Sequence, residues 1–323
     1  MTLATDQMTR SPHARSSQRP QGVWALLQEN LLYRVVARLP KAVMIGSFIA
    51  VPLLWLMGLH LMPLLKMGQI AFYAEYPLPV GQEQTLTTRH FSAFFENPNF
   101  RTPLLRTFTL AAATSALTLL VALPIGWLIA RHSSTKSQLR KLLILMAPFW
   151  AGELVRAFAL VLVGANKGLI NETLKALGVI ETPIPLLYNT GAVHFGMFYF
   201  LILYQTLPLY NAMTKIPVSV SEAAADLGAG PWRRFAYVTL PLLRPAIASS
   251  TALVFLMSLG AYSVPLLLGG NDSVLFAQTI ATIFNSGSNT WPQGAAFSVI
   301  FLVLAFVAAA IWFRLVAGKG EKV

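Results

Sequence analysis

The sequence is dominated by long apolar segments, most of which contain no charge. The first extends from Ala42 to Leu65, between Lys41 and Lys66. At about 1.5 Å per helical residue, this segment can cross the roughly 30 Å hydrocarbon core of a bilayer. Only 11% of the 323 residues are charged, against about 25% in a typical soluble domain. The chain is therefore predicted to be an all-α membrane protein, because a helix satisfies its backbone hydrogen bonds internally.

Six membrane spans are predicted from the same pattern. They lie near residues 42–65, 107–130, 139–164, 193–213, 245–268 and 294–313. The segment before the first span, the second and fourth connections and the C-terminal tail carry an excess of Lys and Arg, whereas the other connections are balanced or nearly uncharged. Because basic loops stay in the cytoplasm, both termini are expected on that side.

This topology divides the chain into segments with different expected roles. The segments are a cytoplasmic and partly disordered N-terminal part at 1–41, a transmembrane domain at 42–317 with an external loop at 66–102 and a cytoplasmic loop at 215–244, and a cytoplasmic tail at 318–323. The external loop is expected either to contact a soluble protein or to pack on its own spans.

Several classes of function are excluded by what the sequence lacks. The net charge of +12 is spread between the apolar segments and does not form the single basic patch that nucleic-acid binding needs. With no cysteine, the chain has neither disulfides nor a thiolate metal site. It also contains no G-x-x-x-x-G-K-[ST] motif for nucleotide phosphates and no cluster of His or acidic residues. We therefore expect no enzyme activity, no metal and no cofactor in this chain.

The cytoplasmic loop contains the sequence SEAAADLGAGPWRRFAYVTLP at residues 221–241. Ser219 or Ser221 is expected to cap a short helix with Glu222 in its first turn, where a carboxylate suits the positive helix end. Gly228 or Gly230 is expected to end that helix in a left-handed conformation. The next proline suits the start of a second helix. An ordinary amphipathic surface helix is the alternative interpretation.

The spacing in this loop resembles the EAA loop of ABC-importer permeases, with Val238 in place of the usual Ile. We refer to residues 215–244 as the EAA loop. The resemblance implies six transmembrane helices of the type I ABC-importer permease kind, with a cytoplasmic coupling helix between spans 4 and 5. It also implies that the loop transmits force from a partner ATPase through Glu222, Ala223, Ala224, Asp226, Gly228 and Pro241.

Further stretches resemble the spermidine/putrescine branch of these permeases. They lie at residues 147–150 with 154–156, 166–180, 262–265 with 269–270, and 291–296. The branch implies import of a polyamine or a similar organic cation, with opines, phosphonates or another small organic solute as the alternative. One departure is Leu266, which replaces a carboxylate found in several polyamine carriers. A stand-alone channel or secondary carrier is less well supported, because only the third span clearly carries charges.

The resemblance also implies a set of partners and a location. The partners are a dimer of ABC ATPases that binds ATP and Mg²⁺, a second permease subunit (a second copy of this chain or a paralogue), a periplasmic solute-binding protein and membrane lipid. The expected location is the bacterial inner membrane.

A candidate substrate pathway comes from the charges in the third span. Glu153 and Arg156 lie three residues apart and share a helix face if the segment is helical. Charges at membrane depth are costly unless paired or functional. They are therefore expected to form an internal salt bridge, to snorkel to the membrane interface, or to line the solute pathway with aromatic walls for an organic cation. The candidate pathway residues are Trp150, Glu153, Arg156, Tyr204 and Tyr262.

Overall fold

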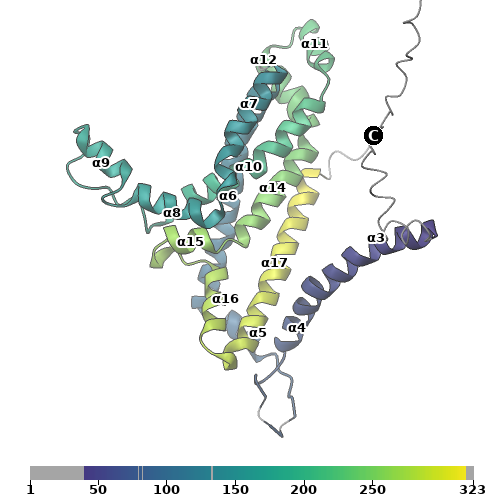
Figure 1. Cartoon of the computed structure of the whole chain (residues 1–323), viewed down its shortest axis with the longest axis vertical. Helices are drawn as coiled ribbons and strands as arrows, with labels where there is room; N and C mark the ends of the chain where they lie inside the picture. The colour runs from purple at the N-terminus through teal and green to yellow at the C-terminus, as the bar shows by residue number, and fades with distance from the viewer. Residues whose placement is uncertain (1–39, 79, 82, 132–133, 318–323) are drawn as a thin grey trace, which may run out of the picture. The chain divides into compact units, whose positions relative to one another are not determined.

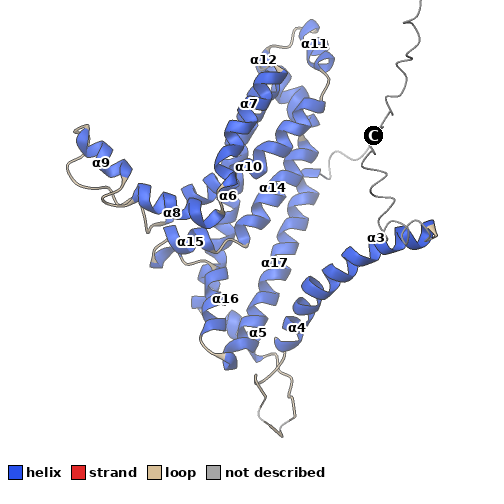
Figure 2. Cartoon of the chain, in the orientation of Figure 1, coloured by secondary structure: helices blue, strands red, loops and turns tan. Residues whose placement is uncertain are grey.

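A computed structural model describes residues 40–317 apart from 79, 82, 132 and 133. The expected disorder near the N-terminus and the tail at 318–323 lie outside these residues. The described chain is helical except for its connections and one isolated antiparallel bridge between Tyr73 and Leu86 (Figure 2). The predicted all-α class is confirmed.

The chain divides into two compact units, residues 1–66 and residues 67–323. The described part of the first is a helical run made of α3 (Lys41–Leu56), a π-helical segment (Met57–Leu61) and α4 (Met62–Ile70), whose last turn belongs to the second unit. Apolar side chains such as Trp55 and Phe48 are exposed along it, which suits contact with lipid or with another subunit.

Four long helices form the core of the second unit: α6 (Pro98–Arg131), α10 (Thr190–Lys215), α14 (Arg244–Leu259) and α17 (Trp291–Ala317). α10 packs along α6, and α14 contacts α6, α10 and α17 (Figure 1). Small side chains such as Thr114 and Ser115 are buried on α6, as is usual where membrane helices approach closely. Gly126 lies in the same interface, where a Cβ would meet the Met213 sulfur at 3.4 Å.

The third predicted span is not one continuous helix, contrary to the sequence-based prediction. It consists of α7 (Thr135–Met146), a 3₁₀ turn (Ala147–Trp150) and α8 (Glu153–Gly164), and its two parts are bent by 88°. Pro148 lacks an N–H donor, and Ala151 is extended with ψ 137°, so the helical hydrogen bonding stops here.

The fifth predicted span is also interrupted. α14 ends at Leu259, and a separate short helix, α15 (Ser263–Leu268), follows. Before α14, the chain forms α12 (Pro231–Arg234), a π-helical segment (Phe235–Thr239) and α13 (Leu240–Leu242), with a bend of 69° between residues 231–242 and α14. Four described helices are long and apolar enough to cross a membrane, or up to six if each bent pair is one span.

Shorter helices cover one end of the second unit. They are α5 (Arg89–Glu96), α16 (Phe276–Asn285) and the 3₁₀ turns Asn271–Ser273 and Ser288–Thr290, while α9 (Leu169–Ala176) follows α8. Phe94, Phe276 and Phe297 form a buried aromatic cluster that joins α5, α16 and α17. This cluster packs the segment of residues 67–97 against the helical core.

Candidate functional site

The EAA loop joins α10 to α14 and contains a helix, α11 (Val218–Asp226). Contrary to the sequence-based prediction, neither Ser219 nor Ser221 caps this helix, because Pro217 is its N-cap residue and the helix begins at Val218. Glu222 therefore lies in the second turn and not the first. The residue before a proline is driven out of the helical region, which explains why the chain turns at Ile216, with ψ 117°.

Gly228 ends α11 with a φ of +80°. The Gly228 N–H donates to the Ala225 carbonyl at 2.8 Å, and the Ala229 N–H donates to the Ala224 carbonyl at 3.0 Å. These two bonds form a Schellman motif, in which a left-handed residue satisfies the last free carbonyls of a helix. Of the two glycines considered, Gly228 has this role, whereas Gly230 is the N-cap of α12 with φ −66°.

The EAA loop is fixed to the helical core on one side and exposed on the other. Arg131 at the end of α6 donates to the Ile216 carbonyl at 3.0 Å, and the rings of Trp127 and Phe235 meet edge to face at 6.1 Å. Leu227 and Trp232 are 89% and 77% exposed. Of the predicted coupling residues, Glu222, Ala223, Asp226 and Gly228 are exposed, while Ala224 on α11 and Pro241 on α13 are half-buried.

A second candidate site lies beside the breaks in the third and fifth spans. A cavity of about 270 Å³ is lined by residues of α8, α10, the end of α14 and the start of α15. Four of the predicted pathway residues line it: Glu153, Arg156, Tyr204 and Tyr262. The fifth, Trp150, does not, and its side chain is 84% exposed. We refer to this cavity as the span-break pocket.

Arg156 lies between two aromatic rings. Its Cζ is 4.4 Å from the ring centroid of Phe149 and 4.4 Å from that of Phe200, so cation–π contacts join α8, the 3₁₀ turn and α10. Phe149 also meets Tyr204 edge to face at 6.2 Å. The guanidinium atoms Nε and Nη1 are buried and have no hydrogen-bond partner among the described residues.

Glu153 is exposed on the first turn of α8. Its carboxylate forms no salt bridge with Arg156. Elsewhere in the described part of the chain, the Lys175 ammonium and the Glu172 carboxylate do pair, at 3.9 Å. The internal salt bridge, one of the alternatives expected for Glu153 and Arg156, is therefore not formed in this structure. The two charges share a pocket without neutralising each other.

Sequence reasoning did not identify the ring of Phe200 or the polar contact beneath the pocket. Gln205 is fully buried on α10 and donates to the hydroxyls of Ser250 at 2.9 Å and Thr251 at 3.0 Å on α14. A glutamine inside an apolar span was a signal for such a contact. No sequence signal distinguished Phe200 from the other apolar residues of its helix.

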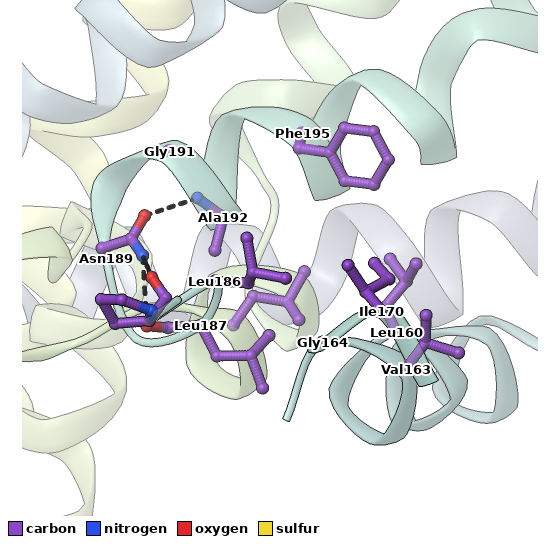
Figure 3. Close-up of a pocket in the computed structure, with 12 residues that line it drawn as sticks. Leu160, Val163, Gly164, Ile170, Leu186, Leu187, Asn189, Gly191, Ala192 and Phe195 are labelled. Carbon is purple, nitrogen blue, oxygen red and sulfur yellow. Dashed lines mark hydrogen bonds between the residues drawn. The ribbon is translucent and has the colours of Figure 1, made fainter. Parts of the chain in front are cut away.

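A larger and mostly apolar pocket of about 420 Å³ lies between α8, α9, the start of α10 and α15 (Figure 3). Its polar side chain, Asn189, caps α10 by accepting from the Ala192 N–H at 2.9 Å, and donates to the carbonyls of Pro185 and Leu187. Since this side chain is satisfied, and the other lining residues carry no charge, the pocket is less suited to a polar solute than the span-break pocket.

Membrane-length helices, interrupted spans beside a charged pocket and an exposed helical loop define a multi-pass membrane transport protein. Residues 43–319 match the family described as the inner membrane component of binding-protein-dependent transport systems. The chain belongs to this family and is a type I ABC-importer permease. This membership excludes the stand-alone channel and the secondary carrier.

Known relatives and structures agree with this assignment. The chain is 32% identical over 220 residues to the spermidine/putrescine transport system permease protein PotB of Salmonella typhimurium, covering 68% of this chain and 75% of PotB. It matches a chain of a bacterial ABC transporter that imports the acidic polysaccharide alginate with TM-score 0.73 and 16% identity, over 91% of this chain and 100% of that one. A structure of an alginate transporter with an alginate pentasaccharide-bound periplasmic protein matches with TM-score 0.72 and 16% identity, over 91% of this chain and 99% of that one.

Proposed function

We propose that the chain is the non-catalytic permease subunit of an ATP-driven importer and forms part of its translocation pathway. ATP and Mg²⁺ are bound by a dimer of partner ATPases, a paralogous permease completes the pathway, and a periplasmic binding protein delivers the solute. Both termini and the EAA loop are cytoplasmic, which fits the excess of basic residues there. The family membership and the exposed α11 support this arrangement.

Force reaches the membrane through the EAA loop in this proposal. α11 presents Glu222, Ala223 and Asp226 outward, and small side chains let a partner surface approach closely. The Schellman turn at Gly228 holds α11 in a fixed orientation, and the bond from Arg131 to Ile216 ties its start to α6. A displacement of α11 by the ATPase therefore moves the ends of α6 and α10.

We propose that the imported solute is a small organic cation of the polyamine kind. The observation that carries this proposal is Glu153 at the span-break pocket, which is exposed and has no salt-bridge partner among the described residues, with Tyr204 and Tyr262 in the same lining. A carboxylate attracts an ammonium group, and tyrosine rings bind cations through their faces. The relative's name, a spermidine/putrescine permease, points the same way. Opines, phosphonates and related solutes are the second candidate, favoured by Arg156 in the same pocket.

Glu153→Gln tests the proposal, because it keeps the shape of the side chain and removes its charge. Import of labelled putrescine into proteoliposomes containing the complete importer is expected to fall about tenfold, the loss of one charge-assisted contact, while basal ATP hydrolysis is retained. Glu172→Gln is the matched control, since Glu172 lies on α9 outside the pocket lining and should leave import unchanged. Unchanged import by Glu153→Gln would remove Glu153 from the pathway.

A further inference from the structure

The span-break pocket contains two opposite charges that do not pair with each other. Of its lining residues, Glu153 and Arg156 are the only ones that carry a charge. Glu153 is exposed, whereas the Nε and Nη1 atoms of Arg156 are buried without a hydrogen-bond partner among the described residues. The pocket therefore brings together an exposed carboxylate and a guanidinium whose Nε and Nη1 groups are unsatisfied.

The surroundings of Arg156 leave two N–H groups at the edge of the guanidinium plane, Nε and Nη1, without acceptors among the described residues. Phe149 and Phe200 lie at 4.4 Å from the guanidinium carbon and provide no acceptor for its N–H groups. A guanidinium has five N–H donors in one plane, so its in-plane donors need oxygen partners. Buried donors of this kind are normally satisfied, as with Asn171, which makes three hydrogen bonds to backbone groups.

Carboxylates are the ligands that best match this edge, because two parallel N–H groups bind their two oxygens. An ammonium on the same molecule would be attracted by Glu153. A plain diamine instead brings one of its two positive charges towards Arg156 once the other is held by Glu153. The cavity of about 270 Å³ lies just below the usual range for ligand pockets, which favours a small molecule.

We propose that the span-break pocket binds a small aminocarboxylate, with the carboxylate on the Arg156 edge and the ammonium towards Glu153. This inference rests on the proposed function and narrows the organic cation to one that also carries a carboxylate. Phe149 and Phe200 each hold the guanidinium in position through a cation–π contact. Arg156 is thus the specificity-determining residue that separates aminocarboxylates from diamines.

The test compares two solutes that share an ammonium on a four-carbon chain. Putrescine carries a second ammonium at the other end, and 5-aminopentanoate carries a carboxylate there. Import of each labelled solute is measured in proteoliposomes containing the complete importer, for the wild type, Arg156→Gln, Arg156→Lys and the control Arg140→Gln. Arg140 lies on α7, outside the pocket lining. The amount of each variant in the membrane normalises the rates.

The wild type is expected to import 5-aminopentanoate, and Arg156→Gln to reduce that import about tenfold, the loss of a hydrogen bond to a charged group. Arg156→Lys should import 5-aminopentanoate at an intermediate rate, since a lysine keeps the positive charge but lacks the two parallel N–H donors of the guanidinium. Putrescine import should not fall in Arg156→Gln, and Arg140→Gln should match the wild type. If Arg156→Gln does not accumulate in the membrane, the comparison of Arg156→Lys with the wild type provides the same test.

Two results would overturn the inference while leaving the proposed function standing. One is ATP-driven import of putrescine without import of 5-aminopentanoate. The other is an equal loss of both solutes in Arg156→Gln, which would make Arg156 a structural residue. The inference is also overturned if neither solute is imported. If, in addition, the binding protein does not stimulate ATP hydrolysis, the proposed function fails as well.

Discussion

Substituting Gly228 by valine tests the role of the EAA loop most sharply. Its φ is +80°, and a Cβ added there would meet no atom within 4 Å, so the cost is backbone strain and not a clash. A left-handed conformation costs an L-residue about 1–2 kcal/mol, with β-branched residues at the upper end. About 2 kcal/mol lowers the ratio of the native turn to other conformations roughly 30-fold, and the two Schellman hydrogen bonds are lost whenever the turn opens.

Two variants serve as matched controls for this prediction. Gly230→Val places the same side chain two residues later, where φ is −66° and a Cβ also meets no atom within 4 Å. Gly228→Asn keeps a residue that tolerates the left-handed conformation. Import and binding-protein-stimulated ATP hydrolysis are measured in proteoliposomes. Only Gly228→Val should lose both, by more than about tenfold if import follows the population of the turn, while its amount in the membrane stays normal.

The reasoning would be refuted if Gly228→Val imported normally, because the strained turn would then have no effect on coupling. Equal losses in Gly228→Val and Gly230→Val would refute it in another way, since the side chain itself and not the backbone angle would be responsible.

Three further predictions concern stability and topology. Asn171→Ala removes a fully buried amide that donates to two carbonyls and accepts from the Ile184 N–H. The free energy of unfolding should fall by about 1–3 kcal/mol because these groups lose their partners, and the thermal unfolding temperature should fall with it. An unchanged temperature would argue against the role of these bonds. Burial and the charge of Arg89 lower the pKa of His90 from 6.5, against the opposing effect of its hydrogen bond to the Tyr73 carbonyl. The unfolded chain then binds more protons than the folded one, so the free energy of unfolding should decrease as the pH falls through 6.5 towards the lower folded pKa. His90→Gln should flatten this pH dependence, measured by thermal unfolding at several pH values. In this cysteine-free chain, an impermeant thiol reagent applied to cells should label a cysteine introduced at Gln82 but not one at Ser137, and labelling at Ser137 would contradict the six-span topology.

The sequence predicted the class of fold because long uncharged segments have few alternatives to membrane helices. The limits of the EAA loop at 215 and 244 coincide with the end of α10 and the start of α14, since charge and proline mark both ends. Hydropathy did not reveal that the third span is bent by 88°, because Pro148 and Gly152 do not interrupt its apolar character.

The candidate site shows a different limit of sequence reasoning. Glu153 and Arg156 stand out as charges, but their spacing fits either an ion pair or two separate roles. Which one occurs depends on Phe200, which comes from another helix and holds the guanidinium face. Likewise, the serines in the EAA loop were good candidates for a helix cap, yet the helix begins before both of them, at Val218, with Pro217 as its N-cap residue. Tertiary contacts and a neighbouring proline decided these two points.

Cross-linking from α11 tests the central claim most directly. A single cysteine at exposed Ala223, labelled with a benzophenone maleimide, is irradiated in membranes that contain the complete importer. We predict cross-linking to the ATP-hydrolysing subunit, while the same label at Ser288, which is exposed in the 3₁₀ turn before α17, gives none. Cross-linking of that subunit from Ser288 and not from Ala223 would contradict the assignment of α11 as the helix that receives the work of ATP hydrolysis.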